Sequence, residues 1–392
     1  MLPLALLAAA QLAALAVLVA RLARGRDRRP PVEPLANADR APHTTVSVIV
    51  PTLNEVHRLG RCLEGLHVQG APLAEVIVVD SRSTDGTVEM VDAMARRDGR
   101  FRRVTDDPLP AGCVGRPWAL DHGFRRANGE WVLGVDADTV PEPGMVAATV
   151  AAAVKHGYDA VSFAPRIVAR SAGARWLQPA LLATLVYRSG PAGADAPAEQ
   201  TMANGQCFLM KRAVLEQAGG YGVARSSFCD DITVARHLAT SGARVGFLDG
   251  PSLFSIEMYT SFAETWREWG RSLGMKDATR PTRQWLDIAF LALAQGAPAL
   301  VLASLALAPA GVRGSAAWWT LLGINAMLVV LRVLLLAASR HSFARRGLAY
   351  WLSPLADPLA AARIFTSTVR RPRRWRGRAY GREVPARAPA AR

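Results

Sequence analysis

Two pairs of aspartates could perform chemistry in this chain. Asp136 and Asp138 stand one residue apart after an apolar run that begins at Trp131, and Asp230 and Asp231 are adjacent further along. An unpaired buried carboxylate is costly, so a cation should lie beside the first pair. Mg²⁺ and Mn²⁺ prefer oxygen ligands and commonly combine one or two carboxylates with substrate phosphates. We therefore treat Asp136 and Asp138 as a candidate metal site, against the simpler interpretation that they are solvated loop residues.

The sequence around these acids alternates between strand and helix patterns. We expect strands at Val46–Val50, Glu75–Val79 and Trp131–Val135, and helices at Arg58–Val68, Thr87–Arg97 and Ile232–Thr240. Continuous apolar strands that alternate with helices predict an α/β fold with a mostly parallel sheet. Ligands of such sheets bind beyond the carboxyl ends of the strands. Because Thr52–Glu55, Asp80–Asp85 and Asp136–Asp138 all follow expected strands, we expect them to meet at one edge.

The N-terminal segment is apolar enough to cross a membrane. Leu2–Ala20 contains 19 almost wholly apolar residues, and about 30 Å of hydrocarbon can be crossed by a helix of this length. A cleaved signal peptide would have its basic residues in front, whereas Arg21 and the arginines up to Arg29 follow the run. We therefore expect a membrane anchor whose C-terminal side is cytoplasmic.

The C-terminal part predicts further membrane segments. Leu286–Ala310 and Trp318–Ala338 are apolar and resemble a helical hairpin. Arg332 inside the second run is costly in lipid, so it should face protein or reach a headgroup. Prolines and charged residues interrupt Gly347–Phe365, for which we expect a re-entrant or interfacial segment.

These patterns divide the chain into five parts. We expect a transmembrane anchor at 1–22, a basic, proline-rich linker at 23–43, a catalytic domain at 44–284, a C-terminal membrane region at 285–369 and a basic cytoplasmic tail at 370–392. The protein is then a multi-pass protein of the plasma membrane or cell inner membrane with a cytoplasmic catalytic domain.

The formal charge of +15 does not indicate a nucleic-acid partner. Much of it flanks the apolar runs, where each basic side chain near an anionic leaflet contributes roughly 1 kcal/mol, and no nucleic-acid-binding motif accompanies it. The cysteines lack metal-type spacing, so we expect free cytosolic thiols at Cys62, Cys113, Cys207 and Cys229.

Four motifs carry a family resemblance. They are Pro51-Thr52-Leu53-Asn54-Glu55, Val79 to Thr87 (VDSRSTDGT), Asp136-Ala137-Asp138 and Asp230-Asp231-Ile232. In this order, over Val46–Leu273, the chain resembles family-2 glycosyltransferases. It looks most like membrane-anchored members that glycosylate lipids, such as carotenoid, hopanoid-linked and ceramide glycosyltransferases. The resemblance implies a Rossmann-like nucleotide-sugar transferase domain.

The resemblance also implies roles for single residues. Nucleotide-sugar contacts fall to Thr52, Glu55, Asp80, Arg116 and Asp136; metal binding falls to Asp138 with Asp136. Asp231 would be the catalytic base, with Asp230 in place of the family's glutamate. Each assignment has a structural alternative: a turn or cap for Asp80, a solvated surface position for Arg116, and a helix cap for the second aspartate pair.

The acceptor side is expected further along the chain. Asn204, Gly205 and Gln206 resemble the family's acceptor-side strand, although they could equally close a turn before a buried strand. Trp266 and Trp269 occupy the region where polymer-making relatives carry Gln-x-x-Arg-Trp, which is absent here. These indoles could seek the membrane interface or pack in the core.

Together these observations predict an inverting, non-processive hexosyltransferase. It would use Mg²⁺ or Mn²⁺ and a nucleotide-diphosphate sugar, with UDP as the favoured nucleotide. The acceptor would be a hydroxyl of a membrane lipid, for example a carotenoid, hopanoid or other glycolipid precursor. The alternatives are a processive polysaccharide synthase and a catalytically silent, membrane-anchored binding module; retention of Asp80, Asp136, Asp138 and Asp231 together argues against the latter.

Overall fold

A seven-stranded sheet forms the centre of the catalytic part. The computed structural model describes residues 2–35, 42–106, 108–269, 273–370, 374–375 and 378–379. The sheet order is β3-β2-β1-β4-β8-β6-β9, and its strands are β1 (Val46–Thr52), β2 (Leu73–Asp80), β3 (Phe101–Thr105), β4 (Trp131–Gly134), β6 (Ala160–Ala164), β8 (Phe208–Lys211) and β9 (Val245–Asp249). All neighbours run parallel except β8, which is antiparallel to β4 and β6. The mostly parallel α/β sheet predicted from the sequence is thus confirmed.

The sheet is parallel and buried because its strands are continuously apolar and helices cover its faces. The helices of this part are α2 (Val56–His67), α3 (Thr87–Arg97), α4 (Gly115–Phe124), α5 (Met145–His156), α7 (Arg212–Gln217) and α8 (Asp230–Thr240). A smaller sheet, β5-β10-β7, joins Thr139–Pro141, Phe254–Ile256 and Arg166–Ile167. The expected strands and helices all occur, with boundaries shifted by a few residues.

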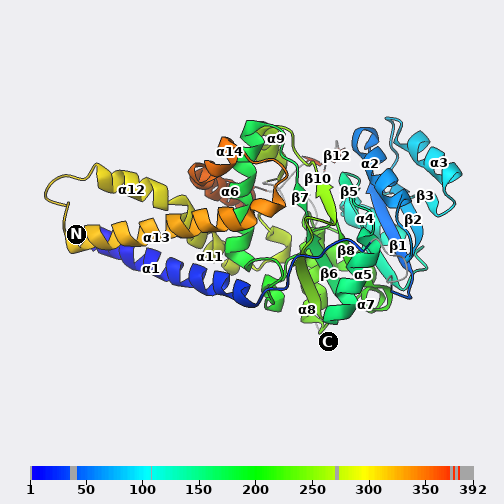
Figure 1. The fold of residues 1–392 in the computed structure, drawn as a ribbon, viewed down its shortest axis with the longest axis horizontal. Helices are drawn as coiled ribbons and strands as arrows, with labels where there is room; N and C mark the ends of the chain where they lie inside the picture. Colours follow the sequence, from blue (N-terminus) through cyan, green and yellow to red (C-terminus); the bar gives the residue numbers. More distant parts are fainter. Residues whose placement is uncertain are drawn as a thin grey trace.

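Apolar helices form a bundle at one end of the molecule. In Figure 1, α1 (Leu2–Ala23), α12 (Pro298–Ala306) and α13 (Ala316–Ala338) lie together at one end of the molecule, away from the sheet. Two helices, Leu2–Asp27 and Ala316–Ser342, are long and apolar enough to cross a membrane. The amide groups of Gln11 in α1 and Asn325 in α13 exchange two hydrogen bonds of 2.8 Å, which pins these helices together.

The apolar run Leu286–Ala310, for which we expected a span, forms a helix that is broken in the middle. α11 (Pro281–Leu291) continues through a π-helical turn at Ala292–Gly296 into α12, and the axis bends by 46°. Pro298 opens α12 and cannot donate a backbone hydrogen bond, so the chain bends here. The pair corresponds either to one broken span or to a re-entrant loop.

Arg332 faces protein, as its cost in lipid predicts. Its guanidinium donates to both carboxylate oxygens of Asp357, at 3.1 and 2.8 Å, and to Ser353 Oγ at 3.2 Å. Gln295 from the π-helical turn also donates to Asp357 Oδ1, at 3.0 Å. The interrupted segment folds as α14 (Leu348–Trp351), a 3₁₀ turn (Ser353–Ala356) and α15 (Asp357–Val369). These elements pack against the apolar helices and α6 (Ala172–Ser189).

The segment after α1, which belongs to the basic, proline-rich linker predicted at 23–43, is docked on the catalytic part. Arg29 N donates to Gly193 O (2.9 Å), and Val32 N donates to Asp249 O (2.8 Å). The Arg29 guanidinium also pairs with Asp195 through two hydrogen bonds. The dark-blue trace of Figure 1 shows residues 24–35, which we call the strap, running from α1 across the domain. The predicted basic tail lies almost entirely outside the described residues.

Candidate active site

Polar side chains gather where β1 and β2 end. Thr52 and Asp80 are register partners at the last positions of these strands. Thr52 Oγ1 donates to Asp80 Oδ1 (3.3 Å), and Ser83 N donates to Asp80 Oδ2 (3.0 Å). The predicted convergence of these residues is correct, and Asp80 both closes the turn and stands at the ligand-binding edge. Its contact with a nucleotide base stays a prediction.

The adjacent turn holds the two ends of helices α2 and α3. Asp85 accepts hydrogen bonds from Val56 N (3.1 Å) and Thr87 N (3.1 Å), so it caps both helices. Glu55 is buried and pairs with Arg58 at 3.2 Å. Asp85 therefore acts as a helix-capping residue, a role for which aspartate is favoured.

Asp106 is an acid of this edge that the sequence motifs missed. It comes directly after the last residue of β3, Thr105, which is the register partner of Asp80, and it is 2% exposed. Ser81 Oγ donates to Asp106 Oδ2 (2.8 Å), and Trp118 Nε1 donates to the Asp106 carbonyl. Asp106 thus places a second buried acid beside Ser81 and close to the strand end that carries Asp80. The strand-end rule that identified Asp80 could have identified Asp106.

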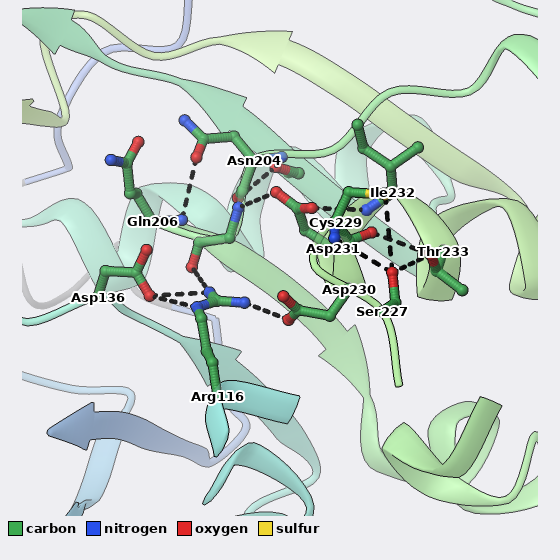
Figure 2. A network of polar contacts seen from close by, with 12 residues as sticks. Arg116, Asp136, Asn204, Gln206, Ser227, Cys229, Asp230, Asp231, Ile232 and Thr233 are labelled. Atoms are coloured by element: carbon green, nitrogen blue, oxygen red, sulfur yellow. Dashed lines mark hydrogen bonds and ion pairs between the residues drawn. The ribbon is translucent and has the colours of Figure 1, made fainter. Parts of the chain in front are cut away.

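Arg116 connects the two aspartate pairs (Figure 2). Its Nε and Nη2 donate to Asp136 Oδ1 (2.9 and 2.8 Å), its Nη1 pairs with Asp230 Oδ2, and its Nη2 donates to Gly205 O (2.9 Å). The side chain of Arg116 is 12% exposed, so the alternative of a solvated surface arginine is wrong. Burial alone would lower the pKa of Arg116, but the charges of Asp136 and Asp230 outweigh it and raise this pKa.

Gly205 is required for this arrangement. A Cβ atom at Gly205 would come within 2.1 Å of Arg116 Nη2, so only glycine lets the guanidinium lie against this backbone. Gly205 N also donates to Asp231 Oδ2 at 2.9 Å. One peptide segment therefore holds both Arg116 and the predicted base.

Asp230 and Asp231 open helix α8, where unpaired backbone N–H groups favour negative charge. Asp231 Oδ1 accepts a hydrogen bond from Ile232 N at 2.9 Å. This contact agrees with the alternative interpretation of Asp231 as a helix cap. Burial raises the pKa of Asp230 to about 7, against the opposing effect of Arg116. Burial also raises the pKa of Asp231, opposed by Arg116 and by the N–H groups of Ile232 and Gly205. A carboxylate with a raised pKa suits proton transfer near neutral pH.

A cavity of about 820 Å³ brings together most of the predicted site. Its wall includes Arg116, Asp136, Asp138, Asn204, Gly205, Gln206, Asp230, Asp231 and Trp269. Thr52, Glu55 and Asp80 lie outside this wall, at the neighbouring strand ends. Asn204–Gln206 form the turn before β8, where Asn204 Oδ1 accepts from Gln206 N at 3.1 Å. Asn204–Gln206 therefore form a turn and also line the cavity.

The two tryptophans of the acceptor side pack inside the molecule. Trp269 is 8% exposed and lies beside Tyr259, whereas Trp266 stacks on Phe262 and receives the Arg363 guanidinium at 5.6 Å from its ring. They lie in an irregular π-helical turn, Thr265–Trp269, and not on an exposed amphipathic helix. The packing alternative is favoured, although Trp269 also contributes to the cavity wall.

The donor set fits a divalent metal that is completed by substrate. Asp136 and Asp138 supply hard oxygen ligands at the cavity, and both contacts from Arg116 fall on the same oxygen, Asp136 Oδ1. Within the described residues, no group of three or more His, Cys, Asp or Glu side chains is placed to hold a metal without further ligands. Mg²⁺ and Mn²⁺ sites commonly take their remaining ligands from substrate phosphates and water.

Comparisons with known proteins define the class of this protein. Among solved structures, the mannosyltransferase PcManGT from Pyrobaculum calidifontis, in complex with GDP-Man and Mn²⁺, matches with a TM-score of 0.53 at 23% identity. The match covers 93% of this chain and 97% of that chain, so the two share the GT-A fold of nucleotide-sugar transferases.

The sequence comparisons point to one family of enzymes. Residues 47–219 match the family model described as Glycosyl transferase family 2, so this part of the chain is similar to family-2 glycosyltransferases. It is 25% identical over 295 residues to the succinoglycan biosynthesis protein ExoA of Rhizobium meliloti, a match of 71% of this chain and 86% of that protein. It is 32% identical over 101 residues to the glycosyltransferase GlyG of Streptococcus pneumoniae, which covers 26% of this chain and 32% of GlyG.

Proposed function

We propose that this glycosyltransferase transfers one sugar from a nucleotide-diphosphate sugar to a hydroxyl of a membrane lipid, with inversion at the anomeric carbon. Carotenoids, hopanoids and other glycolipid precursors are the candidate acceptors. The reaction takes place at the cytoplasmic face, because the basic residues that follow the apolar helices favour that side. The apolar helices make the enzyme a multi-pass membrane protein.

The cavity is the observation that carries the proposal. Its wall contains the predicted base Asp231 and also Leu335, Ala338 and Ser339 at the C-terminal end of the membrane-type helix α13. Leu182 and Leu185 of α6 belong to the same wall. A lipid that leaves the bilayer beside α13 would therefore enter the same cavity that contains Asp231.

The residues account for a single displacement. The acceptor hydroxyl attacks the anomeric carbon, its proton passes to Asp231, and the bond to the nucleotide diphosphate breaks with its electron pair on the departing phosphate oxygen. Asp136 and Asp138 would hold a divalent metal, which would neutralise negative charge on that diphosphate. Arg116 keeps Asp136 and Asp230 at fixed positions around the reacting atoms.

A labelled-donor assay tests the proposal. Membranes that contain the full-length enzyme are incubated with radiolabelled UDP-sugars and GDP-sugars, with divalent metal or with chelator. We expect label in the organic extract for one donor, only when metal is present. Absence of label from every lipid fraction, while donor binds the purified enzyme, would reject the lipid acceptor.

Polysaccharide synthesis is the second candidate, supported by the similarity to the succinoglycan biosynthesis protein. In the same assay it would place the label in material that stays in the aqueous phase and grows in length. A silent binding module would transfer no label to any fraction.

A further inference from the structure

We infer that the acceptor is an uncharged lipid alcohol and not a phosphorylated lipid carrier. This inference rests on the proposed function and adds the charge class of the acceptor to it. It comes from the charges and the apolar side chains of the cavity wall and from the chemistry of Asp231.

The cavity wall has an excess of negative groups. Carboxylates outnumber guanidinium groups among the described residues that form it. Arg28 pairs with Asp249 at 2.9 Å, and Arg58 pairs with Glu55 at 3.2 Å. Arg116 lies between Asp136 and Asp230, as described above. These cations are already neutralised by carboxylates and would have to break an ion pair to receive a phosphate.

Arg267 is the other arginine of the described wall. It is exposed, and two acids that also line the cavity, Glu264 and Glu268, lie three residues before it and one residue after it. The bound substrates do not reverse this balance, because the donor diphosphate brings at least as much negative charge as a divalent cation offsets. A second phosphate beside Asp231 would therefore meet a net excess of like charge on the described wall.

The surface next to Asp231 is apolar. Its neighbour Ile232 packs with Met202, and Leu185 and Phe247 pack against them. All four side chains belong to the cavity wall. Such a surface accommodates an alkyl or isoprenoid chain up to its reacting end, whereas removal of an ionised phosphate from water into it is strongly unfavourable.

The presence of a base points the same way. A lipid alcohol must lose its proton as the new carbon–oxygen bond forms, and Asp231 can accept that proton. A phosphate monoester has a second pKa of about 6, so its attacking oxygen is already ionised near neutral pH. It would gain nothing from Asp231 and would be repelled by its charge.

The charge of the natural product tests the inference. Membranes from cells that naturally contain the enzyme are incubated with labelled donor, and the lipid extract is passed over an anion exchanger and then treated with mild acid. We expect a labelled glycolipid that the exchanger does not retain and that mild acid leaves intact, as for a glycoside of an alcohol. Membranes with Asp231→Asn enzyme provide the background.

Two other outcomes would overturn the inference in distinguishable ways. A retained, acid-labile product would be a glycosyl phosphate, so a membrane lipid would stand as the acceptor while its neutral charge and its attacking hydroxyl would be wrong. Label confined to the aqueous phase would reject the lipid acceptor itself. A second arm supplies purified enzyme in vesicles with a long-chain polyprenol or with the same polyprenol as its monophosphate; we expect at least about tenfold faster transfer to the alcohol, a difference of about 1.4 kcal/mol in barrier.

Discussion

At the scale of single residues, Arg116 decides how the acidic groups of the site are arranged. It binds Asp136, Asp230 and the Gly205 carbonyl at once, a geometry that the planar guanidinium allows and that a lysine ammonium could not reproduce. This one cation offsets part of the cost of burying these carboxylates, although burial still raises the pKa of Asp230. Arg116 thereby fixes Asp136 and Asp230, which are sequence neighbours of the predicted metal ligand Asp138 and the predicted base Asp231.

The metal assignment predicts the effect of Asp138→Ala. Because Asp138 would be a direct ligand, we expect the variant to lose sugar transfer while its thermal unfolding temperature stays close to that of the wild type. Activity measurements with and without chelator, together with a melting curve, check this. Full turnover of the wild-type enzyme in excess chelator would refute the metal site.

The base assignment predicts a loss of turnover in Asp231→Asn. General-base catalysis typically contributes about 100- to 10,000-fold, so we expect kcat to fall in that range while the Kd of the donor changes little. Steady-state kinetics and donor titration separate the two effects. A collapse of donor affinity with normal turnover at saturation would make Asp231 a donor ligand.

The same residue predicts a pH dependence. The pKa of Asp231 is raised by burial, so its protonated form persists to higher pH than in an ordinary aspartate. Only the ionised form accepts a proton, so the wild-type rate should fall as the pH decreases through this raised pKa. The residual activity of Asp231→Asn should lack that acidic limb.

At the scale of elements, one turn that contains a glycine positions residues of the site. One buried pair of amide side chains joins two helices. The turn that contains Gly205 binds Arg116 through its carbonyl and Asp231 through its N–H. Gln11 and Asn325 tie α1 to α13 where both helices are apolar.

Gly205→Ala should disturb the site with little effect on folding. Its added methyl group would displace the guanidinium of Arg116, and a misplacement of about 1 Å at a catalytic group can cost on the order of 100-fold in rate. Gly222→Ala is the matched control, because a Cβ there meets nothing within 4 Å. Equal activity of the two variants would show that the position of Arg116 does not matter for catalysis.

The amide pair predicts a coupled effect on stability. Gln11→Leu and Asn325→Leu should each lower the free energy of unfolding by about 1 kcal/mol, because each leaves a buried amide without its partner. The double variant should lose less than the sum, and Thr320→Val on the exposed face of α13 should change little. Thermal unfolding in detergent measures all four, and strict additivity would exclude the coupling.

At the scale of the whole molecule, local patterns predicted the sheet and much of the site but missed long-range contacts. Continuous apolar runs marked β1, β2 and β4, and their ends located Thr52, Asp80 and Asp136. The docking of the strap was missed because Arg29 finds Gly193 and Asp195 more than 160 residues away, and no local periodicity reports such a contact. The bend between α11 and α12 was missed because the run stays apolar throughout.

The predicted path of the acceptor concerns the molecule as a whole. This path requires one cavity that extends from the apolar helix α13 to Asp231. Residues of α13 and Asp231 line the same cavity. Neighbouring positions on α13 allow a direct comparison: Leu335 belongs to the cavity wall, whereas Leu334 is 59% exposed on the outside of the helix.

A photocrosslinking measurement tests this claim most directly. A photoreactive amino acid is placed at Leu335 or at Leu334 of the full-length enzyme, and membranes are illuminated during turnover of a sugar-labelled donor. We expect labelled glycolipid to attach to the protein at position 335, with several-fold less at position 334. Equal labelling at the two positions, or labelling at position 334 alone, would contradict delivery of the lipid through the cavity.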